Sequence, residues 1–172
     1  MKPLFEEKQR YTQWWLWLII VSAAVIVTGV FMNAVYVQLV TGNPWGDKPL
    51  SDDALIVYAL FMISCMIIML LIFFNSVLEI TVDRSGVSYR YFPLIRSWRR
   101  IDRENIQAYE LKKYYLQGYG IKRDLRGNKT INVKGNTGVE LVMFDGIKLV
   151  LGTQKPDEFL NALKKMKNGR AD

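Results

Sequence analysis

Two long apolar runs dominate the first half of the chain. Trp14 to Val40 spans 27 residues without a charge, and Ala54 to Leu78 adds another 25. A helix needs roughly 20 such residues to cross a bilayer core of about 30 Å. The pattern predicts two transmembrane helices, residues 14–40 and 54–78, joined by a loop at residues 41–53 and preceded by a short N-terminal segment, residues 1–13.

A soluble hairpin and a signal peptide fit these runs less well. A buried helical hairpin of a soluble protein would need more remaining sequence to cover it than this chain offers. A signal peptide would have an apolar region of about 7 to 15 residues after a basic leader, whereas the first run is longer and Glu6 and Glu7 precede it. We therefore expect both helices to be retained and to span.

The hydrophobic pattern changes to alternation after Leu78. "LEITVD" alternates apolar and polar residues, Asp83 to Gly86 forms a turn, and "GVSYRYF" returns as a second strand. Asp145-Gly146 is the strongest hairpin signal and predicts a two-residue turn. Further short strands are predicted at residues 97–101, 106–114, 120–125, 129–133, 138–144 and 147–151.

The chain ends in a predicted amphipathic helix. Pro156 suits its first position, and acidic residues follow at the positive end of the helix dipole. An apolar stripe follows at helical spacing. Its members are Phe159, Leu160, Leu163 and Met166.

This order of elements resembles the pleckstrin-homology-like (PH-like) domain of bacterial membrane proteins with two transmembrane helices. The segments that carry the resemblance are "LEITVDRSGVSYRYFP", "RSWRRIDRENIQAYEL" and "GYGIKRDLRGNKTINVKGNTGVELVMFDGIKLVLGTQKPDEFLNAL". The resemblance implies an α+β membrane protein: an N-terminal helical hairpin, then an antiparallel β-barrel over residues 79–172 whose C-terminal helix closes one end. Phe159, Leu160 and Leu163 are expected to seal its core.

The distribution of basic residues predicts the orientation. Three Lys or Arg precede the first run and six follow the second by Arg103, whereas the loop between the runs has only Lys48. Because basic residues favour the cytoplasmic side, both termini are expected in the cytoplasm of a bacterial inner membrane. Asp52 and Asp53 in the loop are interpreted as first-turn residues of the second helix, without a metal.

The histidine and cysteine content limits the catalytic and metal sites that the chain can form. The chain has no histidine, and its only cysteine, Cys65, lies within an apolar run. Ser-His and Cys-His nucleophiles, a disulfide framework and Cys-based metal sites are therefore excluded. No catalytic residue, cofactor or metal site is predicted, and an enzyme would have to use carboxylates or lysines alone.

Charge suggests a partner for the second half. Of the 23 Lys and Arg residues, 19 follow Leu78. We expect an arginine cluster to contact anionic lipid or a protein partner, because basic groups close to a membrane helix are attracted to anionic headgroups. Nucleic acid is not the expected partner. The cluster consists of Arg90, Arg96, Arg99, Arg100 and Arg103.

Two further features have a structural and a functional interpretation. The "GNTG" and "GTQKP" turns can offer backbone N–H groups to an anion, although turns of this composition mostly reverse strands. Ser22, Gly29 and Asn33 share one face of the first helix, where small and polar residues favour helix packing. That packing is expected within the hairpin or between chains, the two being nearly equal alternatives.

The expected function is non-catalytic: a membrane protein that presents a binding or assembly module at the cytoplasmic face. The alternative is an accessory or regulatory subunit of a larger membrane complex such as a transporter. Transport by this chain alone is not expected, because neither apolar run contains an ionisable Asp, Glu, Lys or Arg inside it. An enzyme is the third possibility.

Overall fold

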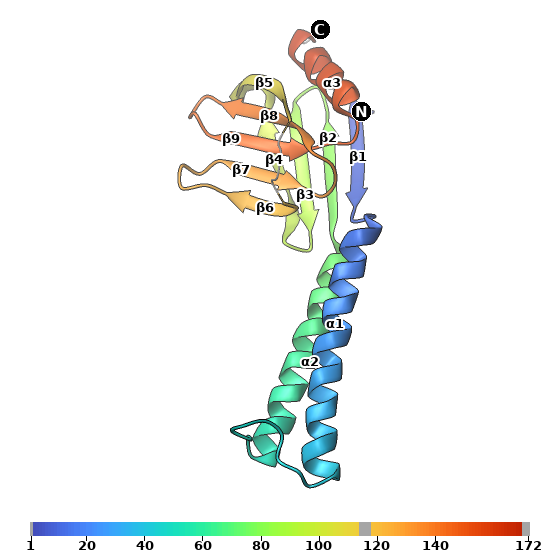
Figure 1. Cartoon of the computed structure of the whole chain (residues 1–172). Coiled ribbons are helices and arrows are strands. Elements are labelled where there is room, and N and C mark those ends of the chain that lie inside the picture. The colour runs from blue at the N-terminus through green and yellow to red at the C-terminus, as the bar shows by residue number, and fades with distance from the viewer. Residues whose placement is uncertain (1, 114–117, 170–172) are drawn as a thin grey trace. The chain divides into compact units, whose positions relative to one another are not determined.

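The computed structural model describes residues 2–113 and 118–169, which form two compact units. The helical unit is Gln13–Asn75. The β-domain combines Met1–Thr12 with Ser76–Asp172, so both ends of the chain contribute to it. Figure 1 shows the chain from its N-terminus through the helices to the last helix. The helical unit is thus an insertion within the β-domain.

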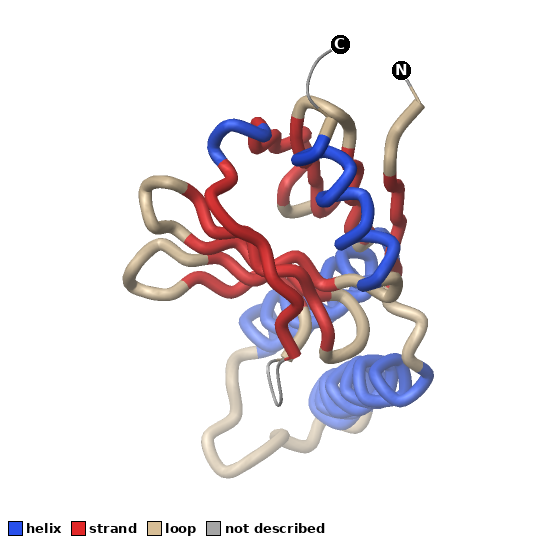
Figure 2. The backbone as a smooth tube through the Cα atoms, turned by 90° about the horizontal axis from the view of Figure 1, so that it is seen from above, coloured by secondary structure: helices blue, strands red, loops and turns tan. Residues whose placement is uncertain are grey.

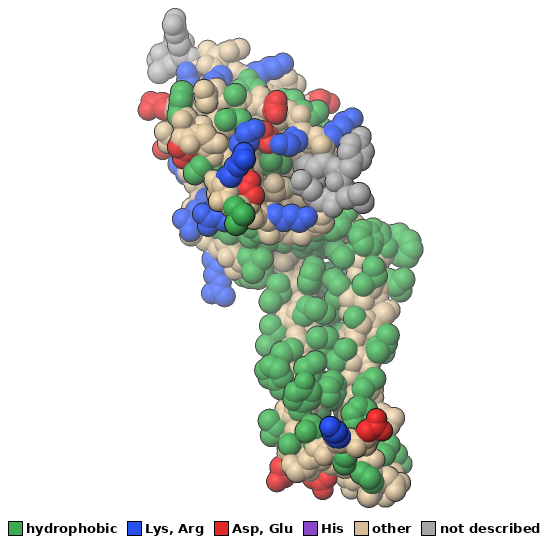
Figure 3. All heavy atoms as spheres, turned by 60° about the vertical axis from the view of Figure 1, so that its left-hand side comes forward, with side chains coloured by type: hydrophobic (Ala, Val, Ile, Leu, Met, Phe, Trp, Pro, Cys, Tyr) green, Lys and Arg blue, Asp and Glu red, His purple; other side chains and the backbone are tan. Residues whose placement is uncertain are grey.

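The helical unit is a pair of long apolar helices. Helix α1 covers Trp14–Val35 and continues as a π-helical turn, η1, over Tyr36–Val40, and helix α2 covers Asp52–Asn75. Both are long and apolar enough to cross a membrane. Hydrophobic side chains cover most of the face of the helices that is visible in Figure 3. Helix α2 ends three residues before the predicted Leu78, because Val77 and Leu78 already belong to a strand.

Sheet A has four antiparallel strands in the order β1-β2-β3-β4. The apolar residues that alternate with polar ones along β2 face the core, because successive side chains of a strand point to opposite faces. Leu78, Ile80 and Val82 are fully buried, and their partners in the neighbouring strands are buried as well. The strands are β1 (Phe5–Arg10), β2 (Val77–Val82), β3 (Gly86–Phe92) and β4 (Ile95–Asp102).

Strand β1 was not predicted, because residues 1–13 were expected to be only a short N-terminal segment. "FEEKQR" lacks an apolar alternation, yet its odd-numbered side chains are buried. Phe5 stacks on Phe159 with ring centroids 4.9 Å apart. The Gln9 side chain donates to the carbonyl oxygen of Gly152 at 2.7 Å. Long-range partners, invisible in the local sequence, therefore define this strand.

Sheet B has five strands in the order β5-β8-β9-β7-β6. The expectation of a wholly antiparallel arrangement is wrong, because β7 and β9 pair in parallel. Strand β8 pairs with the other side of β9, so β9 lies between β8 and β7. The strands are β5 (Ile106–Lys113), β6 (Gly120–Arg123), β7 (Lys129–Asn132), β8 (Thr137–Met143) and β9 (Lys148–Gly152).

The expected closed barrel is not formed. Among the described residues no strand pairing joins sheet A to sheet B, and β4 ends sheet A as an edge strand. Arg96 to Arg100 are all exposed, so this edge carries charged side chains instead of a second sheet. The β-domain is therefore a two-sheet structure with open edges.

Helix α3 (Pro156–Asn168) packs against β1 and β2 of sheet A and against β5 and β8 of sheet B. Pro156 begins it, as predicted. Phe159, Leu163 and Met166 are fully buried. Leu160, which we expected in the core, is only half-buried. Ala162 is buried in its place. The helix thus joins two sheets that no strand pairing connects within residues 2–113 and 118–169.

The β8–β9 connection is a hairpin with a three-residue turn, not the predicted two-residue one. Met143 N–H donates to the Ile147 carbonyl oxygen at 3.0 Å, and Gly146 N–H donates to Met143. Gly146 has φ +79°, the left-handed conformation that glycine adopts easily. The β6–β7 loop lies beside this turn, as the two adjacent loops in Figure 2 show, and the Lys148 N–H donates to Asn128 Oδ1.

Candidate functional site

Arg90 of β3 is held in place on the outer side of sheet A. Its guanidinium pairs with Glu79 and lies 4.9 Å from the ring centroid of Trp98, while Lys8 also contacts Glu79 at 3.0 Å. The hydrogen bond from Arg90, helped by Lys8 and opposed by burial, holds the pKa of Glu79 below its usual range. The side chain of Arg90 in β3 therefore contacts side chains of both neighbouring strands, β2 and β4.

Two other arginines of the predicted cluster have structural roles. Arg100 contacts Asp83 at 3.3 Å and Asp102 at 2.9 Å, which fixes the β2–β3 turn against β4. Arg103, in the 3₁₀ turn η2 (Arg103–Asn105), donates to the carbonyl oxygens of Lys167 and Gly169. Cationic donors suit these carbonyls at the C-terminus of α3.

Arg96 and Arg99 differ from the other three. Both are exposed, and neither forms an ion pair with any residue that the structure describes. Their charges remain available to an external anion. The sequence thus grouped five arginines by proximity along the chain, whereas the fold assigns three of them internal partners.

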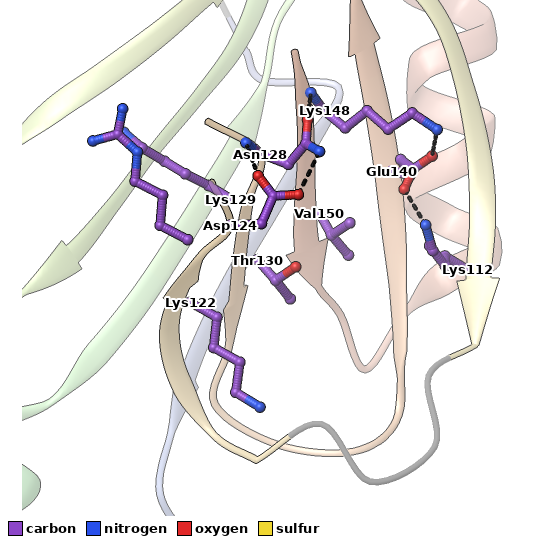
Figure 4. A pocket seen from close by; sticks show the side chains of 10 residues that line it. Lys112, Lys122, Asp124, Asn128, Lys129, Thr130, Glu140, Lys148 and Val150 are labelled. Atoms are coloured by element: carbon purple, nitrogen blue, oxygen red, sulfur yellow. Dashed lines mark hydrogen bonds and ion pairs between the residues drawn. The ribbon is translucent and has the colours of Figure 1, made fainter. Parts of the chain in front are cut away.

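A cationic hollow that the sequence did not predict lies on the outer face of sheet B (Figure 4). We call it the sheet B hollow. It encloses about 330 Å³, and five basic side chains outnumber two acidic ones in its lining. The basic residues are Lys112, Lys122, Arg123, Lys129 and Lys148, and the acidic residues are Asp124 and Glu140.

Glu140 is the buried anion of this hollow. Its side chain is 2% exposed, although β8 directs it away from the core, and it pairs with Lys112 of β5 and Lys148 of β9. Burial alone would raise the pKa of Glu140. The two lysines outweigh burial and hold this pKa below its usual range. Glu140 is therefore the charged centre that joins three neighbouring strands.

Asp124 has an internal use as well. Its carboxylate accepts the backbone N–H groups of Arg126 and Asn128 at 2.9 Å and so shapes the β6–β7 turn. Both carboxylates of the hollow are thus occupied, which leaves a surplus of exposed positive charge. Such a surface attracts anions, and its geometry selects no particular one. The lysine positions had no signal in the sequence, because they depend on strand register.

The "GTQKP" turn does bind an anion, but that anion belongs to the protein. The Thr153 hydroxyl donates to the Glu7 carboxylate at 2.6 Å, and the Gln154 N–H donates to it at 2.8 Å. The turn between β9 and α3 therefore captures strand β1. The same segment donates to Lys134: the Gln154 side-chain amide reaches its carbonyl oxygen at 2.7 Å.

Ser22, Gly29 and Asn33 are exposed on one face of α1, away from its contact with α2. The buried residues of α1 are Ile20, Ala24 and Ala34, on the other side. A Cβ atom added at Gly29 would meet nothing within 4 Å. This face is therefore open in the structure, and its packing, within the hairpin or between chains, stays a prediction.

Within the described residues, no group of three or more Cys, Asp or Glu side chains could hold a metal ion. No family model matches the chain, and no curated protein matches it. The resemblance to bacterial PH-like membrane proteins therefore rests on the sequence pattern alone.

Proposed function

We propose that the chain is an integral protein of the bacterial inner membrane that presents a PH-like binding module at the cytoplasmic face. The helices α1 and α2 anchor it, and the β-domain binds. Two sheets with one C-terminal helix packed on both support the PH-like assignment. Non-catalytic action is supported by the complete absence of histidine from the sequence.

One observation carries the membrane proposal. Only 17% of the most apolar window of the first helix is buried, and only 11% of that of the second. A soluble protein would cover such helices with its own chain, because exposed contiguous apolar surface mediates membrane or protein contact. Lipid is the solvent that two uncovered helices of this length require.

The orientation is tested by cysteine labelling in intact cells. Lys48→Cys and Arg126→Cys are each made in a Cys65→Ser background and treated with a membrane-impermeant maleimide. We expect position 48 to react in intact cells and position 126 only after permeabilisation, because basic residues flank the helices on the cytoplasmic side. Labelling of position 126 alone in intact cells would reverse the topology.

Anionic lipid is the proposed partner of the module. Arg96 and Arg99 support it, since their charges have no internal counter-ion among the described residues. Each basic group near an anionic leaflet contributes about 1 kcal/mol of attraction. The other three arginines of the predicted cluster form contacts within the domain, and their charges add to the positive electrostatic potential of its surface.

The second candidate is an accessory subunit that assembles through its helices. The observation that favours it is the exposed face formed by Ser22, Gly29 and Asn33, opposite the contact with α2. Small and polar side chains allow close approach and hydrogen bonding between helices in lipid. A second copy or another membrane protein would occupy this face.

Gly29→Leu tests assembly without disturbing the hairpin, because the added side chain has open space around it. We expect the detergent-corrected mass from light scattering to fall towards a single chain of 20.0 kDa. Ala23→Leu is the control, since Ala23 is also exposed but lies about 100° around the helix from Ser22. A wild-type protein that is already monomeric, and retains no partner from native membranes, would contradict assembly.

A further inference from the structure

The turn between β3 and β4 is unusual in composition. Its residues are Phe92, Pro93 and Leu94, which we call the β3–β4 tip. Pro93 is an ordinary turn residue, but Phe92 and Leu94 are large apolar residues where turns usually collect Gly, Pro, Asn, Asp or Ser. Phe92 is 41% exposed and Leu94 is 60% exposed. The β2–β3, β6–β7 and β8–β9 turns follow the usual rule, each with glycine and aspartate. The tip therefore places hydrophobic side chains where a soluble domain would place polar ones.

Strand register puts this tip at the end of sheet A from which the chain continues into the helices. Arg10, Val77 and Phe92 are consecutive partners across β1, β2 and β3. Val77 follows Asn75, the last residue of α2, by two positions. Two residues reach at most about 7 Å, and opposite residues in neighbouring strands lie about 5 Å apart. Covalent continuity alone thus keeps Phe92 within about 12 Å of the end of α2.

The surroundings of the tip match the boundary between lipid headgroups and acyl chains. Trp98 is 47% exposed and carries the guanidinium of Arg90 over its ring. Arg96 follows the tip by two residues and, like Arg99, has no ion pair with a described residue. Aromatic side chains prefer headgroup depth, and arginines pair with lipid phosphates. Apolar side chains flanked by unpaired cations are typical of interfacial insertion.

We infer that Phe92 and Leu94 insert into the headgroup layer of the same bilayer that holds α1 and α2, with Arg96 and Arg99 on lipid phosphates. This inference rests on the proposed membrane anchoring and adds a second, hydrophobic attachment. The tip restricts the orientation of the β-domain at the membrane surface, because an attachment at two separate points prevents free rotation about the chain connections.

The test measures the depth of a fluorophore on the full chain in vesicles of phosphatidylcholine and phosphatidylglycerol, at about one protein per thousand lipids. Leu94→Cys, in a Cys65→Ser background, is labelled with a polarity-sensitive dye. We expect at least twofold stronger quenching by a shallow spin-labelled lipid than at Leu125→Cys, and protection from aqueous iodide. Leu125 is the matched control, a fully exposed leucine in the β6–β7 turn.

Two outcomes would overturn the inference. Iodide access at position 94 equal to that at position 125 would place the tip in water. Protection from iodide without quenching by the spin-labelled lipid would show that protein covers the tip. Ile67→Cys in α2, 52% exposed and near the middle of that helix, reports on the anchoring itself through quenching by a spin-labelled lipid with its label deep in the acyl chains. If position 67 is quenched and position 94 is not, only the tip fails; if neither is quenched, the proposed anchoring fails and the inference with it.

Discussion

Replacing Gln13–Asn75 with an Asn-Gly turn is expected to give a folded β-domain that is soluble without detergent. Arg10 and Val77 are opposite each other in neighbouring antiparallel strands, so a short loop can join them. The Tyr11 hydroxyl, 2.7 Å from that of Tyr91, remains at its place beside this loop. The measurements are size-exclusion chromatography in plain buffer, circular dichroism and a cooperative thermal transition.

The matched control is the same protein without residues 2–10. This deletion removes the ring of Phe5 that stacks on Phe159 and the carboxylate of Glu7 that accepts from Thr153. Loss of a buried Phe costs about 3–5 kcal/mol, and stranded buried donors cost about 1–3 kcal/mol each. Because domains are stable by only about 5–15 kcal/mol, we expect the control to be unfolded. Aggregation of the complete β-domain under the same conditions would mean that the helices are required for its fold.

The second large effect is expected from Gly86→Ala at the start of β3. An added Cβ atom would overlap the carbonyl oxygen of Ile101 and lie 3.0 Å from Cα of Asp102, its partner in β4. Both are backbone atoms, so the clash can be relieved only by moving β4 away. We expect a loss of about 3 kcal/mol in the free energy of unfolding, or roughly 10–20 °C in the melting temperature.

Gly118→Ala provides the comparison for this substitution. The nearest atom to its added Cβ is the flexible end of Lys122 at 3.8 Å, an ordinary contact. Its melting temperature should stay within a few degrees of the wild type, because surface changes usually cost less than about 0.5 kcal/mol. Equal melting temperatures for the two variants would show that β4 does not pack on β3 as described.

The hydrophobic pattern within a single segment was sufficient to predict some of the helices and strands. The lengths of the apolar runs identified both helices, alternation identified β2 and β3, and Pro156 marked the start of α3. The predicted strands after Phe92 lie close to β4 to β9, apart from Tyr114, which falls outside the described residues. In each case the signal is contained in one contiguous segment.

Elements defined by distant partners were missed. Glu7 and Gln9 face the interior of the β-domain although both are polar, because their partners come from the segment Gly152–Gln154. Glu140 had no signal in the sequence, because only strand register brings lysines to both sides of it. The internal partners of Arg90, Arg100 and Arg103 could not be predicted for the same reason, since ion pairs and hydrogen bonds depend on tertiary neighbours.

The interrupted β1–β2 hairpin has a consequence for biosynthesis. Strand β1 leaves the ribosome before its partner β2, which is not made until the whole segment Gln13–Asn75 has been synthesised, roughly 3–13 s later at ordinary rates of translation. Throughout this wait its inward-facing Glu7 and Gln9 keep the unpaired strand hydrophilic. Their hydrogen-bond partners lie near the C-terminus, just before α3. Strand β1 is thus made long before the residues that secure it, and the β-domain cannot be completed before the segment Gly152–Gln154 has been synthesised.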